Sequence, residues 1–208
     1  MGCFVPLDPP FGDTATLGGI VAANSSGPRR LLYGTVRDML LGVRYVNPEG
    51  KVIGMGGKTV KNVSGYDVSK LMIGSMGTLG VLCEMTFRLL PLPERSATTV
   101  IAFASMDKAF SLVQSILASK LTPAAVELFD TQSAISSSVL LQDIAENARY
   151  FVAVLAEGAT EEVERIRSDT ISMGTEAGST AQLDLENEAH LSFWNSYGAT
   201  TNRAADDL

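Results

Sequence analysis

Two glycine-rich segments are the part of this sequence whose residue types and spacing could support chemistry. The first is Gly18–Gly27 (GGIVAANSSG), and the second is Gly74–Gly80 (GSMGTLG), which leads directly into an alternating apolar segment. Residues with a small side chain, or with none, let the backbone approach a ligand closely. A dinucleotide or a flavin is the usual ligand in such a place. The alternative is a pair of turns that join core elements. The order of the two segments and the residues between them favour ligand binding.

The composition is that of an ordinary globular protein. The chain has 208 residues, of which 46% are hydrophobic and 19% charged, and its formal net charge is −7. A chain of this length can bury a core in one or two domains. The acidic balance argues against a nucleic acid or an anionic membrane surface as the main partner. An anionic ligand would therefore have to be bound by backbone N–H groups and helix N-termini.

The two cysteines and the single histidine exclude several kinds of site. Cys3 and Cys83 form no C-x-x-C pair, and His190 is the only histidine. We therefore expect no metal site, no iron–sulfur cluster held by this chain alone, no disulfide framework and no Ser-His-Asp triad. Because Cys83 alternates with apolar residues, we expect it in the core. No apolar stretch reaches the ~18 residues of a transmembrane helix, so the cytoplasm is the default location.

The first half of the chain predicts short elements around the two glycine-rich segments. A helix capped by Asp13 or Thr14 should run to about Asn24, with free amides at its start. Residues 1–12 are proline-rich and predict no element, and Asp67 should cap a further short helix. Strands are predicted at 41–46, 51–53 and 81–90.

The pattern of the sequence changes after Pro93, and we place a domain boundary near 94–96. The first domain is then 1–95 and the second 96–208. The second half predicts a β-α-β-β-α-β order, which is typical of a ferredoxin-like half-domain, so the fold class is α+β. The strands are predicted at 98–103, 125–129, 150–155 and 181–185, and the helices at 106–120 and 161–172. One face of the first helix should carry Phe110, Val113, Ile116 and Leu117.

A third glycine-rich run, Gly54–Thr59, has the Gly-Lys-Thr of a nucleotide-binding P-loop without its context. Val52 stands where the first glycine of that motif belongs, and no helix start follows. The dinucleotide-binding pattern fails as well, because Thr59 stands where its third glycine belongs. We do not expect a nucleoside triphosphate site here.

Six ordered blocks between Leu7 and Pro93 resemble one known family. They are ATLGG (15–19), AANSSGPRR (22–30), YGTVRD (33–38), GGK (56–58), VKNVSGYD (60–67) and GSMGTLGV (74–81). This stretch is similar to the flavin-binding domain of the vanillyl-alcohol oxidase superfamily, the p-cresol methylhydroxylase type. Within that superfamily it resembles the FAD-binding subunits of glycolate oxidases.

The resemblance implies the second half of a p-cresol methylhydroxylase-type FAD-binding domain, followed by a partial ferredoxin-like cap domain. In this family FAD lies between two α+β subdomains and is held mostly by backbone amides and small residues. The first glycine-rich segment would line the pyrophosphate and ribityl side, and the second would approach the flavin and the adenosine portion. For Asn24, a turn residue that bonds its own backbone is the alternative. The cofactor-binding residues so implied are Thr16, Gly18, Gly19, Ala23, Asn24, Gly77, Thr78, Gly80 and Val81.

The sequence departs from the family pattern in two places. The family's pyrophosphate loop lies upstream of these motifs, and residues 1–12 do not contain it. Because part of the pyrophosphate cradle is therefore missing, we expect this chain alone to bind FAD weakly or not at all. The second half matches only in the order of its elements and is shorter than the usual cap. Relatives that oxidise 2-hydroxy acids carry histidine-containing sites in the cap. His190 alone cannot build such a site, and we assign no catalytic residue.

The resemblance implies an FAD-dependent subunit of a complex that oxidises glycolate or D-lactate, both small 2-hydroxy acids. A sister flavin subunit and an iron–sulfur subunit would be its partners, and they could place it at the periphery of a membrane. The alternatives are a non-catalytic assembly subunit and a truncated homologue that does not hold FAD. The cations nearest the motifs could meet a substrate carboxylate or be solvated surface charges: Arg29, Arg30, Arg37, Lys58 and Lys61.

Overall fold

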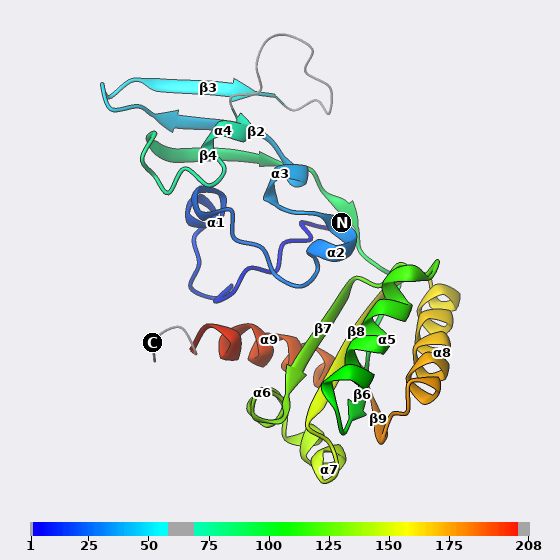
Figure 1. Ribbon diagram of the computed structural model, residues 1–208. Helices are drawn as coiled ribbons and strands as arrows, with labels where there is room; N and C mark the ends of the chain where they lie inside the picture. Colours follow the sequence, from blue (N-terminus) through cyan, green and yellow to red (C-terminus); the bar gives the residue numbers. More distant parts are fainter. Residues whose placement is uncertain (1, 58–68, 204–208) are drawn as a thin grey trace. The chain divides into compact units, whose positions relative to one another are not determined.

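Two units of structure make up the chain, Met1–Leu92 and Pro93–Leu208. The computed structural model describes residues 2–57 and 69–203 (Figure 1). The expected helix cap at Asp67 and the cations Lys58 and Lys61 lie outside the described residues.

The first unit is built on a three-stranded antiparallel sheet with the order β3-β2-β4. One face of this sheet packs on helix α1 (Leu17–Ala23), because apolar residues of the strands alternate with small and charged ones. The predicted strand–turn–strand around 47–50 is confirmed. The strands are β2 (Leu40–Val46), β3 (Val52–Gly56) and β4 (Val81–Phe87). The buried core consists of Ile20, Val21, Val36, Leu40, Val43 and Met72.

A β-bulge in β4 makes the prediction of a buried Cys83 wrong. Tyr45 lies opposite Leu82, and the adjacent Arg44 lies opposite Glu84, so Cys83 has no partner residue on β2. The extra residue shifts the alternation of the strand. Leu82 therefore packs against the core, and Cys83 is exposed.

The N-terminal residues form an element that the sequence does not predict. β1 (Cys3–Phe4) pairs with β5 (Leu90–Pro91) in a two-stranded antiparallel sheet. The expected long strand at 81–90 is therefore two separate strands, because β4 ends at Phe87 and β5 pairs with a different part of the chain.

Short helices complete the first unit. The cap of α1 is Thr16 rather than Asp13 or Thr14, because the preceding residues form a turn in which the Thr14 amide donates to the Phe11 carbonyl. The further helices are α2 (Arg30–Tyr33), α3 (Val36–Met39) and α4 (Ser69–Met72). Thr35 and Asp38 form a capping box at the start of α3.

The second unit contains a four-stranded antiparallel sheet with the order β7-β8-β6-β9. The predicted β-α-β-β-α-β order is confirmed, and with it the α+β fold class. The strands are β6 (Arg95–Phe103), β7 (Ala125–Asp130), β8 (Tyr150–Gly158) and β9 (Ala181–Leu185). The crossover helices are α5 (Met106–Ala118) and α8 (Thr160–Glu176).

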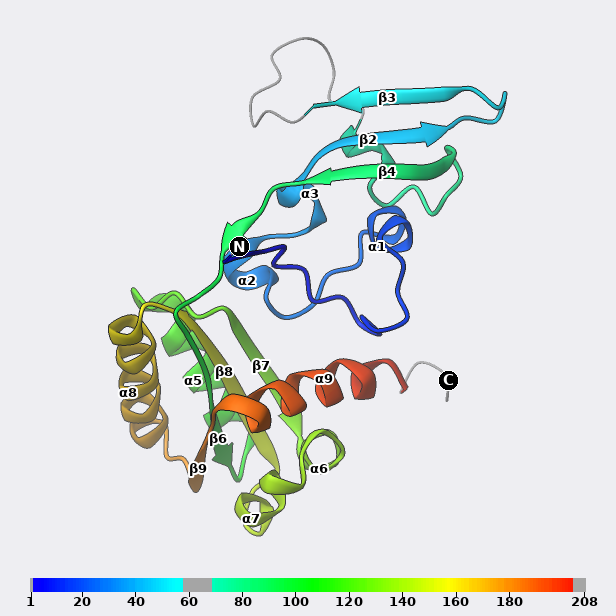
Figure 2. The same ribbon diagram turned by 180° about the vertical axis from the view of Figure 1, so that it is seen from behind.

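Helices cover both faces of this sheet (Figures 1 and 2). α5 and α8 pack on one face through one hydrophobic cluster, and a second cluster lies on the other face. Elements that the sequence does not predict cover that second face: α6 (Thr131–Ser137), a 3₁₀ turn (Val139–Leu141), α7 (Gln142–Ala145) and α9 (Asn187–Arg203).

The buried face of α5 agrees with the predicted one only in part, at Ile116 and at the partly buried Val113. Ala109, Leu112 and Ile116 are the buried residues of this helix. Phe110 and Leu117 are 50% and 60% exposed. The helix is apolar on two adjacent sides, and Ala109 lets the side centred on Leu112 approach the sheet more closely than the side that carries Phe110.

Candidate cofactor-binding site

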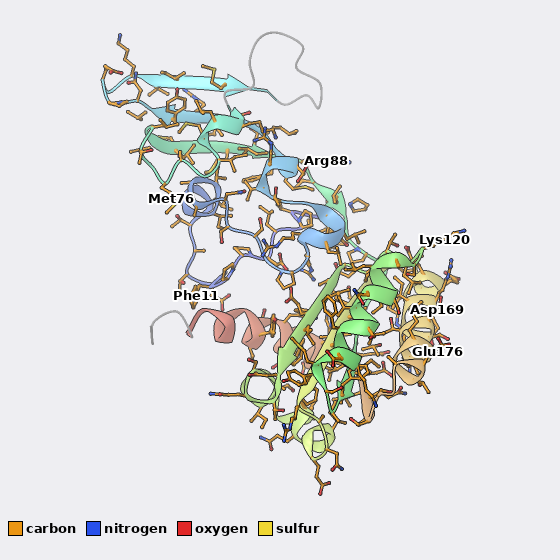
Figure 3. All side chains as sticks on the ribbon, viewed as in Figure 1. Phe11, Met76, Arg88, Lys120, Asp169 and Glu176 are labelled. Atoms are coloured by element: carbon orange, nitrogen blue, oxygen red, sulfur yellow. The ribbon has the colours of Figure 1, made fainter. Side chains whose placement is uncertain are left out.

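The first unit brings the two glycine-rich segments together. The Gly74 amide donates to the Val21 carbonyl at 3.1 Å, and the Met76 amide donates to the Ala22 carbonyl at 2.9 Å. The loop 74–80 therefore lies against the C-terminal half of α1, and Met76 projects from the surface beside that helix (Figure 3). Both segments contribute to one surface of the first unit.

Helix α1 is fixed at both ends by local hydrogen bonds. The Gly19 amide donates to Thr16 Oγ1 at 3.1 Å, which caps the helix. Asn24 ends the helix in the left-handed conformation, with φ of 52°, and its amide bonds the carbonyls of Ile20 and Val21. Its backbone role as a C-cap is thus sufficient to explain Asn24. The neighbouring Ala23 is exposed.

The four glycines among the expected site residues differ in what a side chain at each position would meet. A Cβ on Gly80 (φ of 147°) would overlap the Val46 carbonyl, so the fold itself needs this glycine. A Cβ on Gly18 would make an ordinary 3.7 Å contact with Leu82, and one on Gly19 would lie 3.0 Å from the capping hydroxyl. Gly77 has φ of 75°, and a Cβ there would meet no described atom within 4 Å. The space beside Gly77 is open.

Apolar side chains are exposed around these glycines. Thr78 closes the loop, since its hydroxyl and its amide donate to the Ser75 carbonyl at 2.7 Å and 2.9 Å. Four large apolar residues of α1, the loop and the start of β4 are between 40% and 73% exposed: Leu17, Met76, Leu79 and Val81. The first-turn amides of Leu17 and Gly18 have no acceptor within the helix. A surface with apolar side chains, free amides and open space beside a glycine fits a ligand that is apolar at one end and anionic at the other, such as FAD.

Asp8 fixes the turn that follows α1, and no feature of the sequence predicts this role. Its carboxylate accepts hydrogen bonds from the amides of Gly27 and Arg29 at 3.1 Å and 2.9 Å. Burial raises the pKa of the Asp8 carboxyl, although these hydrogen bonds oppose the change. A Cβ on Gly27 would overlap Asp8, so the turn after α1 needs this glycine. No motif or periodicity marks Asp8, because its partner amides lie about twenty residues away.

Arg30 and Lys70, two cations near the motifs, bond to nearby backbone carbonyls. Arg30 donates to the carbonyls of Ser26 and Gly27 at 2.9 Å and 3.0 Å. Lys70 donates to the carbonyls of Arg37 and Leu40. These bonds tie Arg30 to the turn after α1 and the end of α3 to α4.

His190 has structural partners in the second unit. It is 3% exposed, its Nδ1 lies 2.8 Å from Thr98 Oγ1, and Trp194 Nε1 donates to the same hydroxyl at 2.8 Å. Phe193 and Tyr197 are buried beside Trp194, so this aromatic group belongs to the core of the second unit. Burial, and then the nearby Glu127 carboxylate, raise the pKa of the Tyr197 hydroxyl.

Known families match both units. Residues 1–56 match the FAD binding domain family, and residues 92–204, more than half of the chain, match the C-terminal domain of FAD linked oxidases. The chain therefore belongs to the FAD-linked oxidases. The resemblance inferred from the sequence is confirmed, and so, at the level of the family, is FAD as the cofactor.

Several of the curated relatives are named as glycolate oxidase subunits or D-lactate dehydrogenases. The chain is 36% identical over 169 residues to glycolate oxidase subunit GlcD of Bacillus subtilis (strain 168), which covers 79% of this chain and 35% of that protein. It is 49% identical to glycolate oxidase subunit GlcE of Escherichia coli (strain K12), over 46% of this chain and 27% of that protein. Identity to D-lactate dehydrogenase of Archaeoglobus fulgidus is 40%, over 60% of this chain and 28% of that protein. The chain thus spans about a third of the length of these relatives.

A solved structure has the same fold. An alkyldihydroxyacetonephosphate synthase superimposes with a TM-score of 0.73 over 95% of this chain and 38% of that chain, at 21% identity. This likeness supports the architecture of the two units. In the part of the chain that the structure describes, no helix is both long and apolar enough to cross a membrane.

Proposed function

We propose that this chain is an FAD-binding subunit of a dehydrogenase complex that oxidises a small 2-hydroxy acid, glycolate or D-lactate. The observation that carries the proposal is the contact between the two glycine-rich segments, in a chain of the FAD-linked oxidase family. The names of the relatives support the substrate class, since two are glycolate oxidase subunits and one is a D-lactate dehydrogenase.

This geometry supports the following proposal for the cofactor contacts. Thr16, Gly18 and Gly19 present the start of α1, whose free amides suit pyrophosphate oxygens, and Ala23 and Asn24 continue that side toward the ribityl chain. Gly77 and Thr78 present the open side of the loop to the flavin and adenosine portion. Val81 adds an exposed apolar contact, whereas Gly80 acts by holding β4 against β2.

In the proposed mechanism the protein binds and orients the cofactor. FAD, when bound, would supply the redox chemistry as an acceptor of a hydride or of electrons. Leu17, Met76 and Leu79 would shield the rings of the cofactor from water, because the apolar surface of these three side chains is exposed. None of the described side chains is assigned a proton-transfer role.

The proposed partners are a sister flavin subunit and an iron–sulfur subunit. The naming of two relatives as subunits of glycolate oxidase supports an assembly. The two cysteines of this chain support an iron–sulfur centre on another subunit, because such clusters are usually held by four cysteines. The proposed location is the cytoplasm, or the membrane periphery through these partners.

Titration with FAD tests the proposal against the alternative of an assembly subunit without flavin. We expect saturable quenching of FAD fluorescence by the purified chain, with weaker binding than in an assembled complex. With FAD bound in the assembled complex, D-lactate or glycolate should bleach the oxidised flavin band under anaerobic conditions, and L-lactate serves as the control. A chain that does not bind FAD, in a complex whose only flavin is that of the sister subunit, would establish the assembly role instead.

A further inference from the structure

Helix α5 has an apolar flank that the core of the second unit does not use. Met106, Phe110 and Leu117 are 48%, 50% and 60% exposed, and Val113 between them is half-buried. Their spacing of four, three and four residues is that of a helix-packing seam. Below this flank lie Val126 and Leu128 of β7, which are only partly buried on the same face of the sheet.

The flank faces the free edge of the sheet. α5 packs mainly over β8 and contacts both β7 and β6, and α8 packs over β6 and β8, so α8 lies on one side of α5 and β7 on the other (Figure 1). A Cβ on Gly178, just after α8, would lie 3.0 Å from Lys108 Nζ, which places Lys108 on the α8 side of α5. The seam is about half a turn around the helix from Lys108. It therefore points over β7.

Strand β7 is itself open to pairing. Within the described ranges, β7 pairs with β8 alone, so its outer edge presents backbone N–H and C=O groups without ladder partners. The opposite edge of the sheet, at β9, is polar, because Asp184 accepts hydrogen bonds from Arg167 and Thr99 there. The combination of a free strand edge and an apolar helix flank occurs on the β7 side.

We propose that this surface binds a second copy of the chain about a two-fold axis, with antiparallel pairing of β7 to β7 and of α5 to α5. Strands in a sheet are about 4.8 Å apart, and α5 lies mainly over β8, with β7 and β6 on either side. The two helices would then be about 14 Å apart, so that only the longer side chains of the seam would meet across the axis. A two-fold axis between Phe110 and Val113 sets Phe110 against the partner's Val113 and Met106 against the partner's Leu117.

The charges at the two ends of the seam are self-complementary in this arrangement. Asp107 lies at the start of α5, and Lys120 lies two residues past its end (Figure 3). Both are exposed, and neither has an ion-pair partner within the described part of the chain. Antiparallel pairing brings Lys120 within about one helical turn of the partner's Asp107, twice per dimer. This complementarity favours a second copy over an unrelated apolar partner.

Sedimentation velocity over a wide range of protein concentration tests the dimer. We expect a monomer–dimer equilibrium with a dissociation constant of about 1–100 µM, because one strand edge and one helix flank make a small interface. Leu117→Glu should weaken it by at least about tenfold, since it buries an unpaired charge at the seam. Leu191→Glu on α9 is the matched control, because Leu191 is 57% exposed and lies on the other face of the sheet. It should leave the equilibrium unchanged.

Exchanging the charges of Asp107 and Lys120 distinguishes this dimer geometry from other dimers. Asp107→Lys and Lys120→Asp should each weaken the dimer by about threefold or more, and the double variant should recover the wild-type equilibrium. Circular dichroism checks that every variant is folded. A chain that stays monomeric at every concentration overturns the proposal. A dimer that tolerates Leu117→Glu, or that the double exchange does not recover, also overturns it. None of these outcomes depends on flavin binding.

Discussion

Gly77 and Gly50 form a matched pair that separates backbone strain from cofactor contact. Their φ angles are 75° and 77°, and in both cases an added Cβ would meet no described atom within 4 Å. Both are exposed residues of the first unit, but Gly50 lies in the turn between β2 and β3. A valine at either position must adopt a left-handed conformation, which costs about 1–2 kcal/mol.

We therefore expect Gly77→Val and Gly50→Val to lower the free energy of unfolding of the first unit by the same ~1–2 kcal/mol. Only Gly77→Val should weaken FAD binding, by at least about tenfold, which corresponds to about 1.4 kcal/mol. Denaturant unfolding followed by circular dichroism gives the stability, and quenching of FAD fluorescence gives the affinity. Gly77→Asn is a further control, because asparagine tolerates the left-handed conformation and still fills the space.

Two results would refute this reasoning. If Gly77→Val and Gly50→Val bind FAD equally well, the loop does not approach the cofactor. If both lose FAD together with the fold, strain alone explains the effect of Gly77→Val. If Gly77→Asn keeps wild-type stability but binds FAD weakly, occupied space is the cause.

Three further predictions concern the framework. Gly80→Ala should destabilise the first unit by about 3 kcal/mol and abolish FAD binding together with the fold, because its Cβ would overlap the Val46 carbonyl; thermal unfolding checks this. Asp130→Ala should lose about 1 kcal/mol of stability, because the Asp130 carboxylate caps α6 by accepting from the Ser133 amide at 2.9 Å. That bond lowers the pKa of Asp130, so its contribution is present above the ordinary aspartate pKa and is lost as the pH falls through the lowered value; Asp130→Asn should keep the cap without this pH dependence. Phe193→Ala should destabilise the second unit by about 3–5 kcal/mol in denaturant unfolding, because this side chain is fully buried.

The sequence predicts the parts of the fold that depend on local patterns. The ferredoxin-like order of the second unit follows from the continuous apolar runs of β6 and β8, from the shorter apolar segments of β7 and β9, and from helical periodicity in α5 and α8. The two glycine-rich segments are recognisable because small residues at close approaches are themselves the signal.

Most errors in the predictions from the sequence come from interactions between segments that are distant along the chain. The bulge that exposes Cys83 depends on the register of β4 against β2, and no local pattern records a register. β1 forms because Cys3 and Phe4 meet β5, nearly ninety residues later. Asp8 likewise finds its partners about twenty residues away.

The partial error in the predicted buried face of α5 has a different origin. Periodicity identifies apolar positions, but it does not distinguish the side that packs on the sheet from the adjacent side that holds Phe110 and Leu117. Two adjacent apolar sides give one broad stripe, and the sheet contacts only part of it.

Hydrogen–deuterium exchange with and without saturating FAD tests most directly the claim that α1 and the loop 74–80 together form the cofactor surface. FAD should protect peptides that contain 16–24 and 74–81. The turn at 47–50 and strands β6–β9 should exchange at unchanged rates. Protection confined to other peptides, or no protection at FAD concentrations that saturate fluorescence quenching, would contradict the account.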